Sequence, residues 1–95
     1  MILVLPAERR FGLGTVVVTA NAANALSEIA ISTALYRHAN CDWGELCDED
    51  RQLNAQALLH GSRLFSLYRD DVGLSFYVIT EADRSVTTVL MPEDY

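Results

Sequence analysis

The second half of the chain alternates apolar and polar positions with a period of two, which is typical of half-buried β-strands. The alternation runs through residues 63–69, resumes in 74–80 and returns in 86–91. Residues 70–73 read Asp-Asp-Val-Gly, a composition that favours a tight turn. We therefore expect a hairpin followed by a third strand, joined as an antiparallel meander.

The first half changes its pattern once, from strand-like to helix-like. Residues 13–20 contain a run of β-branched side chains and predict a buried strand. An Ala-rich helix is then expected to begin at Asn21 or Asn24, either of which can cap it, and to end near Ala39. Its apolar stripe would consist of Leu26, Ile29, Ala30, Ala34, Leu35 and Tyr36.

A second helix is predicted to begin between residues 42 and 50 and to end near His60. The acidic run at residues 48–50 fits a first helical turn, where negative side chains interact favourably with unpaired N–H groups. Gly61 stands where a left-handed terminating residue is expected. The apolar side would be formed by Leu53, Ala57 and Leu58, with Leu59 at its flank.

These elements follow one another as strand, helix, helix, strand, strand, strand. Because the last three connections are too short for parallel crossovers, we expect an α+β fold with a mainly antiparallel, three- to four-stranded sheet and two helices on one face. Ninety-five residues fit one domain, spanning residues 1–95. Residues 1–10 are expected to be an N-terminal extension or to add a short edge strand at residues 2–5.

The charge composition excludes several classes of function. Thirteen acidic residues face seven basic ones, a net charge of −6, and the chain contains no lysine. Schiff-base chemistry and phosphate-binding P-loops are excluded, because both need a lysine amine. Scattered arginines also argue against direct nucleic-acid binding, which needs clustered cations. The excess of acid favours a basic protein partner, or serves solubility alone.

No stretch of the sequence approaches the roughly 18 to 20 apolar residues of a membrane span. Arg9 and Arg10 follow the short apolar run at residues 1–5, which is the wrong order for a signal peptide. We expect a cytoplasmic protein without membrane contact, in which Cys41 and Cys47 stay free thiols in buried positions.

The sequence gives only weak support for a metal site or a hydrolytic active site. His38, Cys41, Cys47 and His60 are possible zinc ligands, but their spacing lacks the paired knuckles of zinc sites, and buried thiols with capping histidines are the simpler interpretation. Two carboxylates, Glu81 and Asp83, could serve a divalent ion in a small metal-dependent hydrolase. A polar hairpin loop explains them more simply, so we predict no catalytic residue, metal or cofactor.

Trp43, the only tryptophan, lies between the two predicted helices. It either packs between them in the core or stands exposed as an interface anchor, a position in which tryptophan is enriched. The surrounding acids would suit an arginine-rich partner surface; they are Asp42, Glu45, Asp48, Glu49 and Asp50.

Two stretches carry a resemblance to a known family. The first reads Asp-Trp-Gly-Glu-Leu at residues 42–46, with Glu49, Asp50 and Asn54 after it; the second runs from Ile79 through residues 83–85 to the Pro-Glu-Asp-Tyr end at residues 92–95. Together they resemble small acidic bacterial proteins carried on plasmids and other mobile elements, over a region from about Phe11 to the end. The cysteines depart from that pattern, so the resemblance assigns them no role.

The resemblance implies a mobile-element setting, and with the acidity it predicts a function. We expect a non-enzymatic accessory protein that binds and inhibits a host defence complex with a basic surface, as anti-CRISPR or anti-restriction proteins do. The expected interface residues are Asp42, Trp43, Glu45, Asp48, Glu49, Asp50, Glu81, Asp83 and Arg84. The alternatives are a homodimeric interaction module, which would use an exposed sheet face, and the metal-dependent hydrolase.

Overall fold

The computed structural model describes residues 10–95, and within them a four-stranded sheet is accompanied by three α-helices. The strands are β1 (Thr15–Val18), β2 (Leu64–Arg69), β3 (Ser75–Thr80) and β4 (Val86–Leu90). The helices are α1 (Ala20–Ala25), α2 (Glu28–Ala39) and α3 (Asp48–His60), and a short 3₁₀ helix, η1 (Pro92–Asp94), follows the last strand. The expectation for residues 1–10 falls almost entirely outside the described residues.

The sheet has the strand order β1-β4-β3-β2 and is mixed. β2, β3 and β4 form the expected antiparallel meander, whereas β1 pairs in parallel with β4. The α+β class and the meander are therefore confirmed. The parallel pair arises because α1, α2, α3 and two further strands separate β1 from β4 along the chain, which leaves ample length for a crossover.

The predicted first helix is wrong in one respect, because it consists of two helices. Leu26 adopts an extended conformation and ends α1, and the hydroxyl of Ser27 accepts the Ala30 amide to begin α2. α1 begins after Thr19, whose hydroxyl accepts the Ala22 amide, so neither predicted asparagine is the cap.

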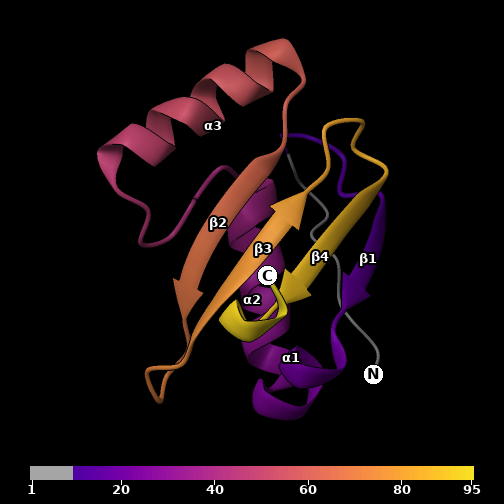
Figure 1. Cartoon of the computed structure of the whole chain (residues 1–95), viewed down its shortest axis with the longest axis vertical. Coiled ribbons are helices and arrows are strands. Elements are labelled where there is room, and N and C mark those ends of the chain that lie inside the picture. The colour runs from indigo at the N-terminus through magenta and orange to yellow at the C-terminus, as the bar shows by residue number, and fades with distance from the viewer. Residues whose placement is uncertain (1–9) are drawn as a thin grey trace.

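The buried stripe of α2 is also shifted from the predicted one. Ile29 and Tyr36 are 79% and 55% exposed, whereas the buried positions follow regular helical spacing: Ile31, Ala34, Leu35, His38 and Ala39. α1 and α2 lie behind the sheet in the view of Figure 1. Their buried side chains form the main core with Tyr68, Phe76, Val78 and Val89 of the sheet's inner face.

α3 begins and ends where the sequence predicts, with the Gly61 backbone in the left-handed region at φ 73°. Its apolar side is not the predicted one, because Leu53 and Leu59 are 61% and 82% exposed and Leu58 is also exposed. Ala57 and the polar Asn54 are buried instead. α3 lies beside the edge strand β2, away from the helices behind the sheet (Figure 1).

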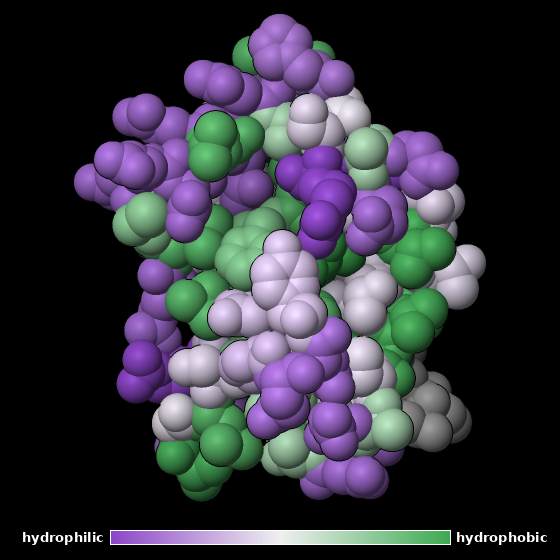
Figure 2. All heavy atoms as spheres, viewed as in Figure 1, coloured by the Kyte–Doolittle hydropathy of each residue, from purple (hydrophilic) through white to green (hydrophobic). Residues whose placement is uncertain are grey.

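The opposite, outer face of the sheet carries no helical layer in residues 10–95. Its side chains include Ile79 and Leu90, which are buried, and Phe65, Leu67 and Tyr77, which are half-buried. The Tyr95 ring packs against Phe65 and Tyr77, and the cluster formed by Trp43, Leu46, Ala57 and Leu64 packs against Phe65 and Leu67. Figure 2 shows apolar and weakly polar side chains on this face, below the strongly polar surface of α3. None of the helices within the described range is long and apolar enough to cross a membrane.

Candidate functional site

The two predicted interface acids that flank Trp43 most closely, Asp42 and Glu45, are paired with arginines. The Arg37 guanidinium donates to both carboxylate oxygens of Asp42, at 2.7 and 3.2 Å, and Arg69 lies 3.3 Å from Glu45. The hydrogen bonds from Arg37 hold the pKa of Asp42 below its usual range. Both carboxylates are half-exposed, so these ion pairs contribute little to stability, but they cancel local charge.

The acids in the first turn of α3 differ from Asp42 and Glu45 because they have no arginine partner within residues 10–95. Asp48, Glu49 and Asp50 are all exposed, and none of them takes part in an ion pair within residues 10–95. The residue before them, Cys47, provides no side-chain cap, so these carboxylates supply the negative charge at the helix start. We call these three residues the α3 acidic cluster. It is the strongest uncompensated charge among the predicted interface residues.

Trp43 is a core residue, so of its two expected roles packing in the core is confirmed and the exposed interface anchor is wrong. Its side chain is 6% exposed and packs in a small cluster with Leu46, Ala57 and Leu64. Its ring also stacks against Phe11 at a centroid distance of 6.2 Å. The sequence leaves both roles open, because the choice depends on whether α3 covers the ring.

The backbone next to Trp43 seals the edge of the sheet. The Leu67 amide donates to the Trp43 carbonyl at 3.1 Å, and the Glu45 amide donates to the Leu67 carbonyl at 2.7 Å. Gly44 lies between them at φ 74°, and a Cβ there would overlap the Leu67 carbonyl oxygen. Two residues before Leu67 in β2, the amide of Phe65 donates to the buried Asn54 side chain of α3 at 3.1 Å, and its carbonyl accepts from the same side chain at 2.6 Å.

These contacts occupy the outward-facing backbone groups of two residues of β2. An uncovered edge strand invites pairing with other chains, and natural proteins protect such edges. The stretch from Asp42 to Asn54 therefore protects the β2 edge and also contains the α3 acidic cluster.

The loop from Glu81 to Arg84 also serves the fold. Asp83 accepts the amide and the hydroxyl of Ser85, at 3.0 and 2.6 Å, and Glu81 lies 3.9 Å from Arg63. Arg84 donates to the carbonyls of Ser62, at 2.6 Å, and Ala57, at 3.1 Å, and so ties down the carboxyl end of α3.

The two predicted acidic regions do not form one surface. The Arg84 contact at Ala57 lies nine residues beyond Asp48, which is roughly 14 Å along a helix axis. The α3 acidic cluster and the Glu81–Arg84 loop therefore lie at opposite ends of α3.

A network of buried side-chain hydrogen bonds, which the sequence does not predict, crosses the inner core. The ring nitrogens of His38 bond the hydroxyls of Ser66 and Thr80, Thr80 bonds Thr87 at 2.7 Å, and Thr87 donates to the Leu13 carbonyl at 2.6 Å. Burial lowers the pKa of His38 to about 3, with a smaller contribution from the nearby Arg84. This neutral, fully paired histidine stabilises the core, and the interpretation of it as a helix-capping residue is wrong.

The possible zinc ligands are not brought together. His38 is enclosed in the core, whereas Cys47 and His60 are exposed at opposite ends of α3. Cys41 is half-buried, and burial raises the pKa of its thiol. The expectation of two buried thiols is therefore wrong for Cys47, although both cysteines are free. Across residues 10–95, no group of three or more His, Cys, Asp or Glu side chains could hold a metal ion.

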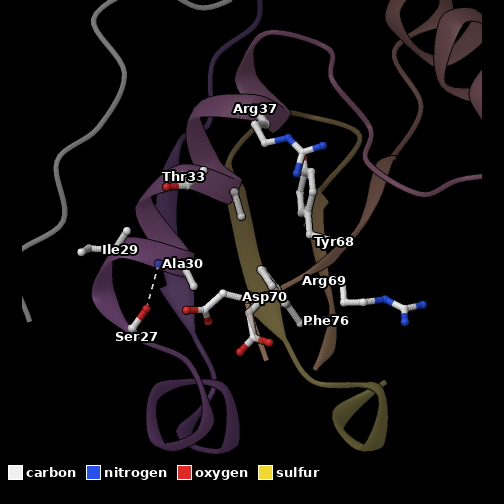
Figure 3. Close-up of a pocket in the computed structure, with 11 residues that line it drawn as sticks. Ser27, Ile29, Ala30, Thr33, Arg37, Tyr68, Arg69, Asp70 and Phe76 are labelled. Atoms are coloured by element: carbon white, nitrogen blue, oxygen red, sulfur yellow. Dashed lines mark hydrogen bonds between the residues drawn. The ribbon is translucent and has the colours of Figure 1, made fainter. Parts of the chain in front are cut away.

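Two surface grooves complete the picture. One, of about 340 Å³, lies between α3 and the outer sheet face and is bordered by Leu53, Phe65, Arg63 and Tyr95. The other, of about 500 Å³, lies between α2 and the turn end of the β2–β3 hairpin (Figure 3). Neither groove contains a buried polar side-chain atom lacking a hydrogen bond, because all such atoms in the described residues have partners.

Comparison with known proteins places no constraint on these sites, because no family model, curated protein or solved structure matches the chain.

Proposed function

We propose that this protein is a non-enzymatic accessory protein that binds a basic surface of a host defence complex and inhibits it, in the manner of anti-restriction or anti-CRISPR proteins. The observation that carries the proposal is the α3 acidic cluster. Its three adjacent carboxylates are exposed and form no ion pair within residues 10–95, whereas Asp42, Glu45 and Glu81 face arginines. A free negative cluster attracts a basic partner and accelerates its association.

The rest of α3 supports contact with a protein. Leu53 is mostly exposed one turn after Asp50, so a partner would meet apolar surface beside the acids. Interfaces bury apolar side chains at their centre and place charges around them. A phosphate backbone would be repelled by the cluster, so the proposed target is the protein surface that normally holds nucleic acid.

The proposed target, a host defence complex, comes from the resemblance to proteins of plasmids and other mobile elements. Such elements survive only if they escape host defence. Restriction and CRISPR complexes act on DNA in the cytoplasm, so the proposal also places this protein there. It requires no catalytic residue, cofactor or metal from the chain.

A plasmid-establishment assay tests the function. A host that carries a restriction enzyme or a CRISPR effector is transformed with a targeted plasmid, with and without expression of this protein. We expect expression to raise the number of transformants at least about tenfold, since blocking a nucleic-acid groove removes its phosphate contacts. No increase against any of the defence systems tested would contradict the inhibitory function.

A matched pair of variants assigns the effect to α3. Asp48→Asn with Glu49→Gln removes two exposed carboxylates from the first turn of α3 and should abolish most of the increase. Glu28→Gln with Glu93→Gln removes the same charge elsewhere, from the first turns of α2 and η1, and should leave the increase unchanged. Equal loss in both would mean that total charge matters and not the α3 acidic cluster.

The outer sheet face favours a second candidate function, a homodimeric interaction module. Its apolar positions, among them Phe65, Leu67 and Tyr77, are only partly covered by η1 and Tyr95. A second copy could bury them. Light scattering on the eluting protein decides between the candidates: a dimer has twice the 10.5 kDa mass of one chain, and a monomer at all concentrations excludes this function.

A further inference from the structure

The larger groove is bordered by α2 on one side and by β2 with the hairpin turn on the other (Figure 3). Its volume is about 500 Å³, which is within the range of pockets that bind small molecules and peptide side chains. The middle is apolar, with Ala30 and Ala34 from α2 facing Tyr68 and Phe76 from the sheet. Ile29, which is 79% exposed, adds an apolar rim.

Four charged side chains border this groove, and the two cations are already paired. Arg37 holds Asp42 in a two-point contact and lies over the Tyr68 ring at 4.8 Å, and Arg69 faces Glu45. These arginines therefore contribute little net positive charge to the groove.

The two acids of the groove lie at its other end and have no cationic partner in the described residues. One oxygen of Asp70 accepts the amides of Val72 and Leu74, which fixes the hairpin turn, and the Asp70 side chain borders the groove. Asp71 follows it in the same turn, exposed. Glu28 in the first turn of α2 offsets the partial positive charge of that helix start. The unmatched charge of the groove is therefore negative.

We propose that this groove binds a segment of a partner protein in which an arginine or lysine stands next to an aliphatic side chain. The cation would lie against Asp70 and Asp71, and the aliphatic side chain would cover Ala30 and Phe76. This binding surface is separate from the α3 acidic cluster and does not depend on the proposed inhibitory function.

Titration of the isotopically labelled full chain with short peptides tests the proposal by NMR. The probe is acetyl-Leu-Arg-Leu-amide, and acetyl-Leu-Glu-Leu-amide has the opposite charge. We expect the arginine peptide to shift the amide signals of residues 29–34 and 70–76 at millimolar concentration, and to bind more weakly as salt is added. The glutamate peptide should bind at least about threefold more weakly, because exposed charge pairs contribute modestly.

Two variants locate the binding. Asp71→Asn removes an exposed carboxylate that forms no side-chain hydrogen bond or ion pair within residues 10–95, so the fold should persist while the arginine peptide binds about threefold more weakly. Glu93→Gln removes one charge from η1 and should leave the affinity unchanged. Equal binding of both peptides, signals that move only outside the groove, or an unaffected Asp71→Asn variant would each overturn the proposal. The variant Asp48→Asn with Glu49→Gln should bind the peptide normally, which separates this site from the proposed function.

Discussion

At the scale of single residues, several side chains of conspicuous chemistry stabilise the fold. His38 bonds two strand hydroxyls inside the core, Trp43 packs beneath α3, and Arg84 holds the carboxyl end of that helix. Each would suit a reactive or binding site if it stood on the surface. Their burial or internal pairing removes them from the interface and leaves the α3 acidic cluster.

Gly44 provides the most specific residue-scale prediction. Gly44→Ala must adopt a left-handed backbone at φ 74° and also overlap the Leu67 carbonyl, so we expect a loss of about 3 kcal/mol or more in the free energy of unfolding. Urea denaturation followed by circular dichroism measures this loss.

Gly61→Ala is the matched control, because Gly61 has nearly the same φ, 73°, and no atom within 4 Å of the added methyl group. It should lose only about 1 kcal/mol, from backbone strain alone. Similar losses in both variants would mean that the close approach to β2 does not matter.

At the scale of elements, α3 combines two tasks. Its inward side is narrow and includes Asn54, which bonds the β2 backbone in place of a neighbouring strand. Its remaining surface is exposed, including the leucines that the sequence assigned to the core. This arrangement leaves most of the helix available for a partner while the sheet edge stays covered.

Asn54→Leu tests the edge contact. Leucine has a similar volume but leaves the Phe65 amide and carbonyl without their partner, so we expect a loss of about 2 to 4 kcal/mol in the free energy of unfolding. Gln52→Leu changes an exposed polar residue of the same helix and should alter stability by less than about 0.5 kcal/mol. A small effect of Asn54→Leu would show that water replaces the lost bonds.

At the scale of the whole molecule, some acidic side chains form ion pairs with arginines and others do not. Arginines neutralise Asp42, Glu45 and Glu81 near β2, and the net charge of −6 is concentrated elsewhere, including the first turn of α3. The sheet likewise has one face covered by α1 and α2 and one on which Phe65, Leu67 and Tyr77 stay half-buried. The proposed recognition of another protein relies on both asymmetries.

Acid stability is a property of the whole fold to which His38 contributes. The folded chain keeps His38 neutral, with a pKa of about 3, whereas the unfolded chain takes up a proton below its ordinary pKa of 6.5. The free energy of unfolding should therefore fall as the pH drops from 7 toward 3, by up to about 1.4 kcal/mol per pH unit from this residue. Urea denaturation at a series of pH values measures the slope.

His38→Gln removes the titrating group and should flatten the dependence between pH 7 and 5. The lowered pKa values of Asp42, Asp83 and Asp94 act in the same direction but at lower pH, where these carboxylates become protonated. An unchanged slope in His38→Gln between pH 7 and 5 would assign the acid sensitivity to other groups.

Much of this fold could be predicted from the sequence because its signals are local. The period-two alternation located β2, β3 and β4 and their meander, and Gly61 marked the end of α3 correctly. Alternation, turn composition and helix termini depend on neighbouring residues, so one chain is enough to detect them. The break between α1 and α2 could not be predicted, because Ser27 is one of several polar residues in this stretch that could cap a helix.

The candidate site was predicted only in part. The sequence identified the acids of α3, but it could not show which acids have arginine partners or whether Trp43 is covered. Asp42 is five residues from Arg37, whereas Glu45 meets Arg69 from a distant strand. The larger groove also combines residues from α2 and the β2–β3 hairpin, which lie more than thirty positions apart.

The sequence by itself determined the fold class, the excess of acid, the absence of lysine and the elements with strong local periodicity, because each of these is a property of composition or of adjacent residues. Only the tertiary structure decided the parallel pairing of β1 with β4, the burial of His38 and Trp43, the sealing of the β2 edge by Gly44 and Asn54, and the separation of free from paired acids. These features depend on which distant segments meet, and that follows from the packing of the whole chain.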